Sequence, residues 1–377
     1  GTLKIRKKRI AAFGFRSIPP SAGAAGADKF VYELLPRLVK KGFTVTAYNR
    51  NYPNQNLRST NFQGVNIVNI TTINKSGFDT LIHSFKSALH ILLYNTADIV
   101  HIQNGGNSIW AALLRLFGKK VFISQDGLDW KRDKWPWYAK IYLKLSIWIT
   151  AHIPDLVICD NIFVKKYFQD FFPKQTNRFD FIPFGSEVEG FNETNVLSSY
   201  DLIRNKYLLF IGRFIPDKGL QYLIPAYKKS EGLGYKLVLV GGSPNRSEFE
   251  TQILKNKSEN IIMPGYLYGD DVNTLIKNAY LYIQPSDVEG LSPVILQVMG
   301  IGTPLLCSDI KENLYIVKNG AVTFIKSNTC DLFKKLSYCI ENPNIISELS
   351  QVSKQRIIKE YNWDSITDQH INIFTGQ

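Results

Sequence analysis

The stretch that decides the fold is Ser286-Asp-Val-Glu-Gly-Leu-Ser-Pro-Val-Ile-Leu-Gln-Val-Met-Gly-Ile-Gly-Thr-Pro-Leu-Leu-Cys-Ser-Asp309. An apolar run at residues 279–284 precedes it and predicts a strand, whereas residues 293–299 predict a helix that ends at Gly300. Glu289 lies in the loop just before this helix. Because the first N–H groups of a helix are unpaired and carry the positive end of its dipole, the loop predicts a site for phosphate or another anion.

Strands and helices alternate through the rest of the chain. A predicted strand at residues 9–15 leads through a glycine-bearing loop into a predicted helix at residues 29–41, and the pattern recurs along the sequence. Such alternation predicts parallel α/β sheets, whose ligands bind at the carboxyl ends of the strands. Because 377 residues exceed the size at which a single core keeps growing, we expect two domains. The polar residues 187–202 lack periodicity and predict the linker.

Basic residues are concentrated in the first half of the chain. The formal net charge is +13, and residues 1–190 hold 26 Lys and Arg against 13 Asp and Glu, whereas residues 191–377 hold 19 of each. A basic domain joined to a neutral one suggests an anionic partner: a membrane surface, a pyrophosphate-bearing acceptor or nucleic acid. No recognisable nucleic-acid-binding module accompanies the charge, so we expect no nucleic-acid partner. A contribution to solubility alone is the simpler alternative.

The cysteines, histidines and apolar runs argue against several classes of protein. Four cysteines show no metal-ligand spacing and predict reduced core thiols, and five histidines form no cluster. No run reaches the roughly 18 apolar residues of a membrane-spanning helix, and the apolar segment after the basic start is too short for a signal peptide. We therefore expect a cytoplasmic protein, peripheral on the inner face of the cytoplasmic membrane.

Two basic residues mark the start of the predicted second domain. An apolar strand ends in Gly212-Arg213, and Lys218-Gly219 follows, ahead of a predicted helix at residues 220–229. Two cations fixed at a strand end and a helix start can neutralise a diphosphate as its bond to a sugar breaks. A surface pair without function is the alternative.

These stretches together resemble the retaining glycosyltransferase family 4, whose members have the GT-B fold. The resemblance rests on Pro-Ser, Glu-Gly and Gly-x-Pro before Ser-Asp in the first stretch, and on Gly-Arg with Lys-Gly in the second. It implies an α/β fold of the GT-B type, with two Rossmann-like parallel-sheet domains facing a central cleft. The implied division is an N-terminal acceptor-binding domain at residues 1–187, a nucleotide-sugar-binding domain at residues 188–360, and a helix at residues 361–377 that crosses back to the first domain.

The first half is similar to the bacterial rhamnosyltransferase-type subgroup of that family. The match consists of a Gly-x-Arg-x-Ile-Pro loop with glycines, at residues 14–26, and of Asp-Gly-x-Asp-Trp-x-Arg-x-Lys-Trp at residues 126–135. In place of the common Gly-Gly-x-Glu, the chain has Gly26-Ala-Asp28. A carboxylate at Asp126 could accept or orient the proton of an attacking hydroxyl, with helix capping as the structural alternative. The predicted acceptor-side residues are Arg16, Asn104, Asp126 and Arg132.

The resemblance also implies a donor site in which Arg213 and Lys218 bind the diphosphate and Glu289 meets sugar hydroxyls. The family has a second Glu where this chain has Gln297. That Glu commonly holds both ribose hydroxyls, so a neutral amide suits a deoxyribose, and we expect a dTDP-linked donor. The implied catalytic residues are Asp126, Arg213, Lys218 and Glu289. The implied donor-binding residues are Gly23, Gly212, Arg213, Lys218, Gly265, Tyr266, Leu267, Glu289, Gly290, Leu291, Ser292 and Gln297, although a structural turn alone would also explain Gly23.

The expected reaction is transfer of L-rhamnose from dTDP-rhamnose to a hydroxyl of a glycan acceptor, with retention of configuration and no metal cofactor. The nucleoside diphosphate sugar is a co-substrate, and the acceptor is expected to be lipid-linked, in bacterial surface polysaccharide synthesis. A UDP- or GDP-hexose-dependent transferase, a GT-B epimerase and a non-catalytic partner subunit of the same fold are the alternatives.

Four of the six tryptophans lie within residues 130–148, interleaved with lysine and arginine. Amphipathic rings beside cations suit a lipid headgroup boundary or the prenyl-pyrophosphate region of a lipid-linked acceptor. An aromatic core in a helical hairpin is the alternative reading of this segment.

Overall fold

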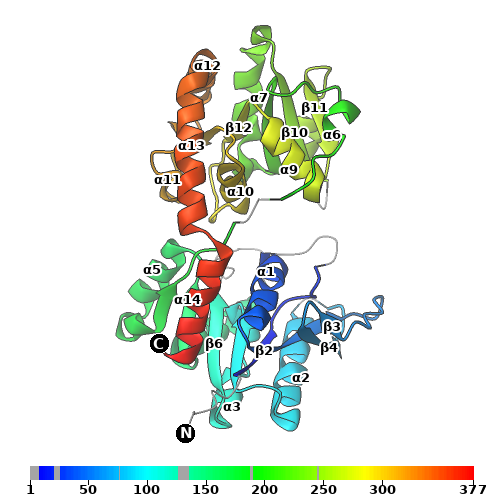
Figure 1. The fold of residues 1–377 in the computed structure, drawn as a ribbon, viewed down its shortest axis with the longest axis vertical. Coiled ribbons are helices and arrows are strands. Elements are labelled where there is room, and N and C mark those ends of the chain that lie inside the picture. The colour runs from blue at the N-terminus through cyan, green and yellow to red at the C-terminus, as the bar shows by residue number, and fades with distance from the viewer. Residues whose placement is uncertain (1–7, 21–25, 76, 126–135, 187–189, 244–245) are drawn as a thin grey trace. The chain divides into compact units, whose positions relative to one another are not determined.

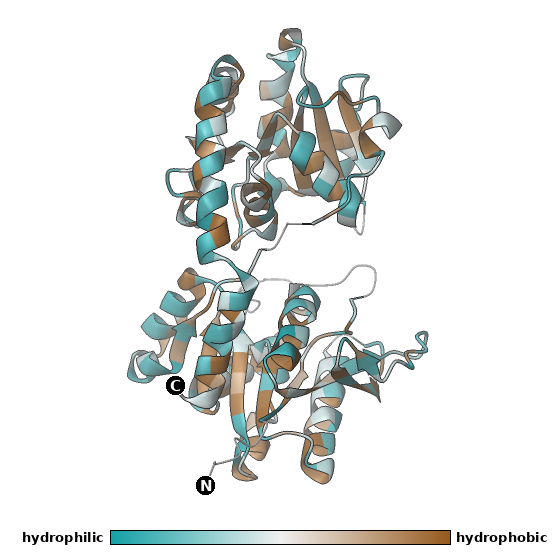
Figure 2. Cartoon of the chain, in the orientation of Figure 1, coloured by the Kyte–Doolittle hydropathy of each residue, from teal (hydrophilic) through white to brown (hydrophobic). Residues whose placement is uncertain are grey.

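The computed structural model describes residues 8–20, 26–75, 77–125, 136–186, 190–243 and 246–377. The chain divides into two compact units (Figure 1). Unit 1 comprises Gly1–Phe184 and Trp363–Gln377, and unit 2 comprises Gly185–Asn362. In both units the strands are the most apolar elements, whereas the helices contain both apolar and polar residues (Figure 2). Each unit has a hydrophobic core between its own sheet and helices.

Unit 1 is built on an eight-stranded sheet with the order β3-β4-β2-β1-β5-β6-β7-β8. All neighbouring strands are parallel except β3 and β4. The strands are β1 (Arg9–Phe13), β2 (Thr44–Asn51), β3 (Asn61–Phe62), β4 (Val65–Thr71), β5 (Ile99–Gln103), β6 (Lys120–Gln125), β7 (Leu156–Cys159) and β8 (Phe179–Phe181). The order reverses between β1 and β5, which makes this the switch point at which ligands of open α/β sheets bind.

Helices cover both faces of the unit 1 sheet. They are α1 (Gly26–Lys40), α2 (Phe78–Tyr94), α3 (Ala111–Leu116), α4 (Trp137–His152), α5 (Ile162–Phe171) and α14 (Trp363–Thr375), with 3-10 turns η1 (Gly105–Asn107) and η3 (Pro173–Arg178). The closing helix α14 packs on α1, where the rings of Trp363 and Phe30 lie 5.9 Å apart. The C-terminal segment is therefore part of the core of unit 1.

Unit 2 has a six-stranded, fully parallel sheet with the order β11-β10-β9-β12-β13-β14. The strands are β9 (Tyr207–Arg213), β10 (Lys236–Gly242), β11 (Ile261–Gly265), β12 (Leu281–Gln284), β13 (Leu305–Ser308) and β14 (Val322–Phe324). In chain order this is 3-2-1-4-5-6, the order of a doubly wound nucleotide-binding sheet. Its switch point lies between β9 and β12.

The helices of unit 2 follow the strands as the sequence predicts. They are α6 (Val196–Ser199), α7 (Leu220–Lys228), α8 (Glu248–Leu254), α9 (Gly269–Asn278), α10 (Pro293–Ile301), α11 (Lys311–Val317), α12 (Thr329–Glu341) and α13 (Pro343–Glu360), with 3-10 turns η4 (Pro216–Lys218) and η5 (Glu231–Leu233). The sequence explains both ends of α10. Ser292 caps its N-terminus, and Gly302 ends it in the left-handed conformation.

Two sequence-based expectations need correction. The predicted linker is only partly a connection, because Val196 and Leu202 are buried in the core of unit 2. The prediction of four core thiols is wrong for Cys330, which is exposed, whereas Cys159, Cys307 and Cys339 are buried and free. Within the described ranges, no helix has both the length and the apolar character needed to cross a membrane.

Candidate functional site

Strands β9 and β12 separate at the switch point of unit 2. They pair only at Leu208 with Leu281 and at Leu209 with Tyr282. Beyond that point the Tyr282 hydroxyl accepts a hydrogen bond from the Ile211 N–H at 3.2 Å and lies 3.0 Å from the Ile211 carbonyl oxygen. The side chain thus replaces the missing strand pairing, and burial raises the pKa of its hydroxyl far above the ordinary value.

Lys218 and Glu289 form an ion pair beside this separation. The ammonium donates to Oε1 at 2.9 Å and to Oε2 at 3.0 Å, and the side chains are 22% and 6% exposed. The pair joins the loop after β9 to the loop after β12, which lie 71 residues apart in sequence. Two predicted catalytic residues are therefore in direct contact.

The Glu289 carboxylate is oriented by two further donors. Its Oε1 accepts hydrogen bonds from Nε2 of Gln284 and from Oγ of Ser286, each at 2.6 Å. By contrast, Oε2 accepts only from Lys218 among the described residues, so it keeps an acceptor position for a sugar hydroxyl. Gln284 and Ser286 were not predicted as site residues, although Gln284 ends the predicted strand at residues 279–284 and Ser286 belongs to the Pro-Ser signal that follows it.

The two loops are held together through their backbones. The Asp217 carbonyl accepts hydrogen bonds from the N–H groups of Asp287, at 2.9 Å, and Val288, at 3.3 Å. Gly219 has φ +82°, and a Cβ there would lie 2.0 Å from the Pro285 carbonyl oxygen. A side chain at this position would push the Lys218 loop away from the Glu289 loop, so the Lys-Gly pair positions the cation.

Arg213 ends β9 and is exposed, and no carboxylate in the described part of the chain forms an ion pair with it. The neighbouring backbone is tightly packed, because a Cβ at Gly241 would lie 1.8 Å from the Gly212 carbonyl oxygen. The predicted donor residues Gly212 and Arg213 are thus at the carboxyl edge of β9, one strand from the loop of Glu289. An unpaired guanidinium at a strand end suits a phosphate.

The remaining predicted residues of this loop surround the start of α10. Gly290 is exposed, with open space where a Cβ would stand, and Leu291 packs partly against the core. The Ser292 hydroxyl caps the helix by accepting from the Ile295 N–H at 3.3 Å. One turn further on, Gln297 donates its amide N–H to Oδ1 of Asn273 on α9. That contact uses one of the two N–H groups of the Gln297 amide, so the amide oxygen and the second N–H can meet a ligand.

Three of the predicted donor-binding residues, Gly265, Tyr266 and Leu267, lie at the end of β11. Gly265 has φ +82°, and Leu267 is partly buried. Tyr266 is 47% exposed. Its ring lies against Gly242 on β10, where an added Cβ would be 3.3 Å from the ring. Burial, followed by the charge of Glu250, raises the pKa of the Tyr266 hydroxyl, whereas Arg213 opposes the shift.

Glu250 is a buried carboxylate that the sequence analysis did not single out. It is 8% exposed, and its Oε1 accepts from the Ser243 N–H at 3.2 Å. Its Oε2 is buried with no hydrogen-bond partner among the described residues. Its sequence signal, Ser247-x-x-Glu250, is that of a helix capping box, and the Glu250 N–H donates to Oγ of Ser247 at 3.1 Å, so the sequence explains the residue by helix structure.

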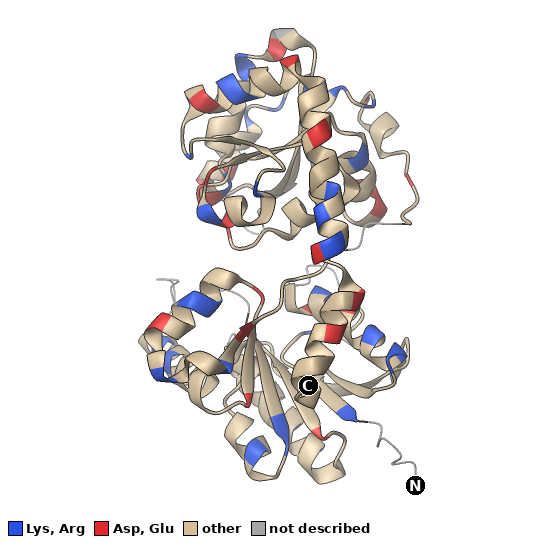
Figure 3. Cartoon of the chain, turned by 60° about the vertical axis from the view of Figure 1, so that its left-hand side comes forward, with Lys and Arg blue, Asp and Glu red and all other residues tan. Residues whose placement is uncertain are grey.

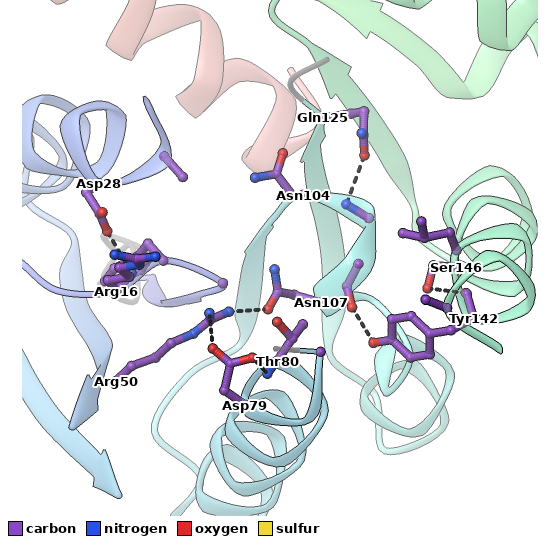
Figure 4. Close-up of a pocket in the computed structure, with 18 of the residues that line it drawn as sticks. Arg16, Asp28, Arg50, Asp79, Thr80, Asn104, Asn107, Gln125, Tyr142 and Ser146 are labelled. Atoms are coloured by element: carbon purple, nitrogen blue, oxygen red, sulfur yellow. Dashed lines mark hydrogen bonds and ion pairs between the residues drawn. The ribbon is translucent and has the colours of Figure 1, made fainter. Parts of the chain in front are cut away.

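Unit 1 has a cavity of about 720 Å³ at its own switch point, within the range of small-molecule sites (Figure 4). The loops after β1 and β5 meet there, since a Cβ at Gly14 would lie 2.4 Å from the Gln103 carbonyl oxygen. Two predicted acceptor-side residues, Arg16 and Asn104, line the cavity. The structure therefore brings these two residues to one site.

Buried polar contacts fix the cavity wall. Nη2 of Arg50 donates to Oδ1 of Asn107 at 2.8 Å, and its Nη1 lies 3.5 Å from Oδ2 of Asp79 (Figure 4). The Tyr52 hydroxyl donates to the same Asp79 oxygen at 2.8 Å. Across the cavity, the Tyr142 hydroxyl donates to the Gly106 carbonyl oxygen at 2.5 Å. None of these residues was among the predicted site residues. The contacts join residues far apart in sequence, such as Arg50 and Asn107, which are 57 positions apart, so no local motif indicates them.

Three predicted residues, Gly23, Asp126 and Arg132, lie outside the described residues. Among the residues that the structure does describe, no group of three His, Cys, Asp or Glu side chains could hold a metal ion.

Two family models match the chain, one in each unit. Residues 202–360 match the model of glycosyl transferases group 1, and residues 46–187 match a domain of unknown function, DUF1972. An uncharacterized glycosyltransferase of Methanocaldococcus jannaschii is 27% identical over 45% of this chain and 44% of its own length. The lipopolysaccharide 1,2-N-acetylglucosaminetransferase of Salmonella typhimurium is 22% identical over 94% of both chains.

Solved structures match over nearly the whole chain. Sucrose-phosphate synthase from Thermosynechococcus elongatus has a TM-score of 0.80 at 17% identity and covers 98% of both chains. Anabaena HepE in complex with UDP-glucose has a TM-score of 0.75 at 12% identity, covering 98% of this chain and 100% of its own. The predicted α/β fold, a GT-B fold of two Rossmann-like parallel-sheet domains, is confirmed, and the family matches and named relatives support a glycosyltransferase enzyme.

Proposed function

We propose that the protein is a retaining glycosyltransferase of family 4 that transfers a sugar from a nucleoside diphosphate donor to a hydroxyl of a glycan acceptor. The observation that carries this proposal is the Lys218–Glu289 ion pair at the switch point of unit 2, with Arg213 at the end of β9, where it pairs with no carboxylate among the described residues. The relatives named for lipopolysaccharide synthesis support a role in surface polysaccharide synthesis. The lipid-linked acceptor and peripheral membrane association are parts of the same proposal.

Three side chains have separate roles in the proposed transfer. Arg213 and Lys218 neutralise the diphosphate as the bond between the sugar C1 and the phosphate oxygen breaks, which lowers the barrier electrostatically. Glu289, already oriented by its neighbours, accepts hydrogen bonds from sugar hydroxyls. The acceptor oxygen forms the new bond to C1 on the same face, and its proton passes to the departing phosphate oxygen. This route retains configuration and needs no pair of enzyme carboxylates.

Gln297 supports a deoxyribonucleotide donor, and dTDP-L-rhamnose is the preferred candidate. Asn273 accepts from one of its two amide N–H groups, so the side chain offers a ligand one neutral acceptor, the amide oxygen, and one further N–H. One acceptor satisfies one ribose hydroxyl, whereas a carboxylate could satisfy two. A UDP- or GDP-hexose donor remains the alternative.

The unit 1 cavity is the proposed acceptor site, and its chemistry favours an uncharged sugar. Its charged side chains balance, with Arg16 and Arg50 against Asp28 and Asp79. Asp28 accepts from the backbone N–H of Arg16 at 2.7 Å, and Asp79 forms an ion pair with Arg50 at 3.5 Å. Carboxamides that can donate to and accept from sugar hydroxyls supply most of the other polar lining, namely Asn54, Gln55, Asn74, Asn104, Asn107 and Gln125.

A donor panel tests the proposal. Purified protein is incubated with dTDP-rhamnose, UDP-hexoses or GDP-mannose and a lipid-pyrophosphate glycan, and released nucleotide and glycosylated product are measured. We expect turnover with dTDP-rhamnose that Lys218→Ala abolishes. The variant Gln297→Glu should shift preference toward a ribonucleotide donor, with Asn273→Ala as a control for the lost amide contact. Donor binding without turnover across the panel would instead favour a non-catalytic partner subunit.

A further inference from the structure

Three helices of unit 1 leave an unusual number of large apolar side chains in solvent. Together with the C-cap residue of α3, they hold 12 of the 26 exposed large apolar side chains in the described part of the chain. On α2 these are Phe78, Phe85, Leu89, Leu93 and Tyr94; at α3, Leu116 and Phe117; and on α4, Trp137, Tyr138, Ile141, Leu145 and Trp148. We call this set the α2–α4 face. Apolar exposure of this extent marks an interaction surface.

The three helices cover the same side of the sheet. The connections β4–α2–β5, β5–α3–β6 and β6–α4–β7 all step toward the β8 edge, and such crossovers are right-handed, so their helices share one face. Direct contacts link them, since the rings of Phe85 and Trp110, at the start of α3, lie 4.9 Å apart. Tyr142 on α4 donates to Gly106, just before α3.

The charge of the α2–α4 face is positive. The three helices contain Lys86, Arg115, Lys140 and Lys144 but a single acidic residue, Asp79, which is held by Arg50 and Tyr52 at the cavity. Arg115 forms an ion pair with Asp155 at 3.4 Å, so the positive charge of the face comes from its three lysines. No carboxylate among the described residues pairs with Lys140 or Lys144. Lys and Arg, in blue, lie on helices and strands of the unit that carries the N label (Figure 3), and residues 1–190 of the sequence hold 26 Lys and Arg against 13 Asp and Glu.

Helix α4 separates the acceptor cavity from this outer surface. Tyr142, Ser146 and Thr150 face the cavity, whereas Trp137, Ile141 and Trp148 are more than half exposed on the other side. A sugar whose lipid anchor lies beside the outer side of α4 would therefore be close to the cavity. Interfacial tryptophans and tyrosines next to lysines suit the headgroup region of a bilayer.

We propose that the α2–α4 face docks the enzyme on an anionic phospholipid surface. Its aromatic and aliphatic side chains lie at the headgroup boundary, while its lysines meet lipid phosphates. Docking in this orientation delivers a membrane-anchored glycan acceptor to the cavity behind α4. The docking assigns the proposed peripheral membrane association to one face of unit 1, and the delivery of the acceptor rests on the proposed glycosyltransferase function.

Vesicle co-sedimentation of the full chain tests the docking. We expect binding to mixed phosphatidylglycerol and phosphatidylcholine vesicles, little binding to phosphatidylcholine alone, and release by salt. The double variant Lys140→Ala/Lys144→Ala should lower the partition coefficient roughly 30-fold, the equivalent of about 1 kcal/mol per lysine near an anionic surface. The double variant Lys255→Ala/Lys257→Ala removes the same charge from exposed positions of unit 2 and should leave binding unchanged.

A second pair of variants tests the apolar contribution. Leu145→Ser/Trp148→Ser should lower partition roughly tenfold, whereas Val352→Ser/Ile358→Ser, at exposed positions of α13, should not. The proposal would be overturned if the protein did not bind the anionic vesicles at low salt. It would also be overturned if the α4 variant and the α13 variant lost vesicle binding equally. A dimer in sedimentation equilibrium that Trp148→Ser dissociates would assign the face to a second copy instead. Nucleotide release without vesicles tests the catalytic proposal separately.

Discussion

Replacing Lys218 with alanine should lower both stability and catalysis. The change leaves Glu289, whose side chain is 6% exposed, buried and ionised without its cation. Removing one partner of a buried ion pair typically costs about 3–5 kcal/mol. Because the Lys218 side chain is 22% exposed and water can reach its position, we expect the lower end, about 3 kcal/mol of unfolding free energy.

The catalytic effect has a different origin. Loss of one group that stabilises developing charge typically lowers kcat by roughly 100- to 1000-fold. We therefore expect a loss of that size in nucleotide release, in addition to weaker donor binding. Urea unfolding followed by circular dichroism measures the first effect, and steady-state nucleotide release measures the second.

The double variant Lys218→Ala/Glu289→Gln separates the two effects. A neutral amide at 289 still accepts from Gln284 and Ser286 and carries no buried charge, so most of the lost stability should return while activity stays absent. The reasoning is refuted if Lys218→Ala unfolds at the same urea concentration as the wild type. It is also refuted if the double variant recovers turnover.

Three further variants test other parts of the structure. Gly219→Ala should destabilise unit 2 by more than about 1 kcal/mol and lower donor affinity, because its φ is +82° and a Cβ would lie 2.0 Å from the Pro285 carbonyl oxygen. Gly290→Ala, in open space, should unfold like the wild type but raise the donor KM if the sugar approaches that backbone closely; an unchanged KM would place the sugar elsewhere. Burial lowers the pKa of His370 to about 4 from an ordinary 6.5, so the unfolded chain takes up its proton first, and stability present above pH 6.5 should fall by about 3 kcal/mol toward pH 4. His370→Leu should flatten this slope in urea unfolding at pH 7 and pH 5, and parallel slopes would contradict it.

The local sequence determined which segments form strands, helices and turns. The helix at α10 follows from a Ser-Pro start and a glycine end, and it forms as Pro293–Ile301, close to the predicted residues 293–299. Gly219 follows Lys218 because the turn requires a left-handed residue. These signals are local, since backbone dihedral preferences and capping act within a few residues.

The order of strands in each sheet decided which of these segments meet. Lys218 and Glu289 are brought together because β9 and β12 are neighbours at the switch point. Tyr282 became part of the site because the two strands diverge there and its hydroxyl satisfies the Ile211 backbone. Neither the spacing nor the residue type of Tyr282 distinguishes it from a core tyrosine.

Burial was the other property that the sequence left open. The aromatic segment of α4 could have formed a core, and the structure instead leaves Trp137 and Trp148 exposed while Tyr142 faces a cavity. The face of a helix that is buried depends on where the rest of the chain packs. The sequence by itself therefore determined the fold class, and short motifs marked Arg213, Lys218 and the acidic loop of Glu289 as candidate site residues. Only the tertiary structure decided the Lys218–Glu289 contact, the unit 1 cavity and the exposed α2–α4 face, because each depends on residues far apart in the chain.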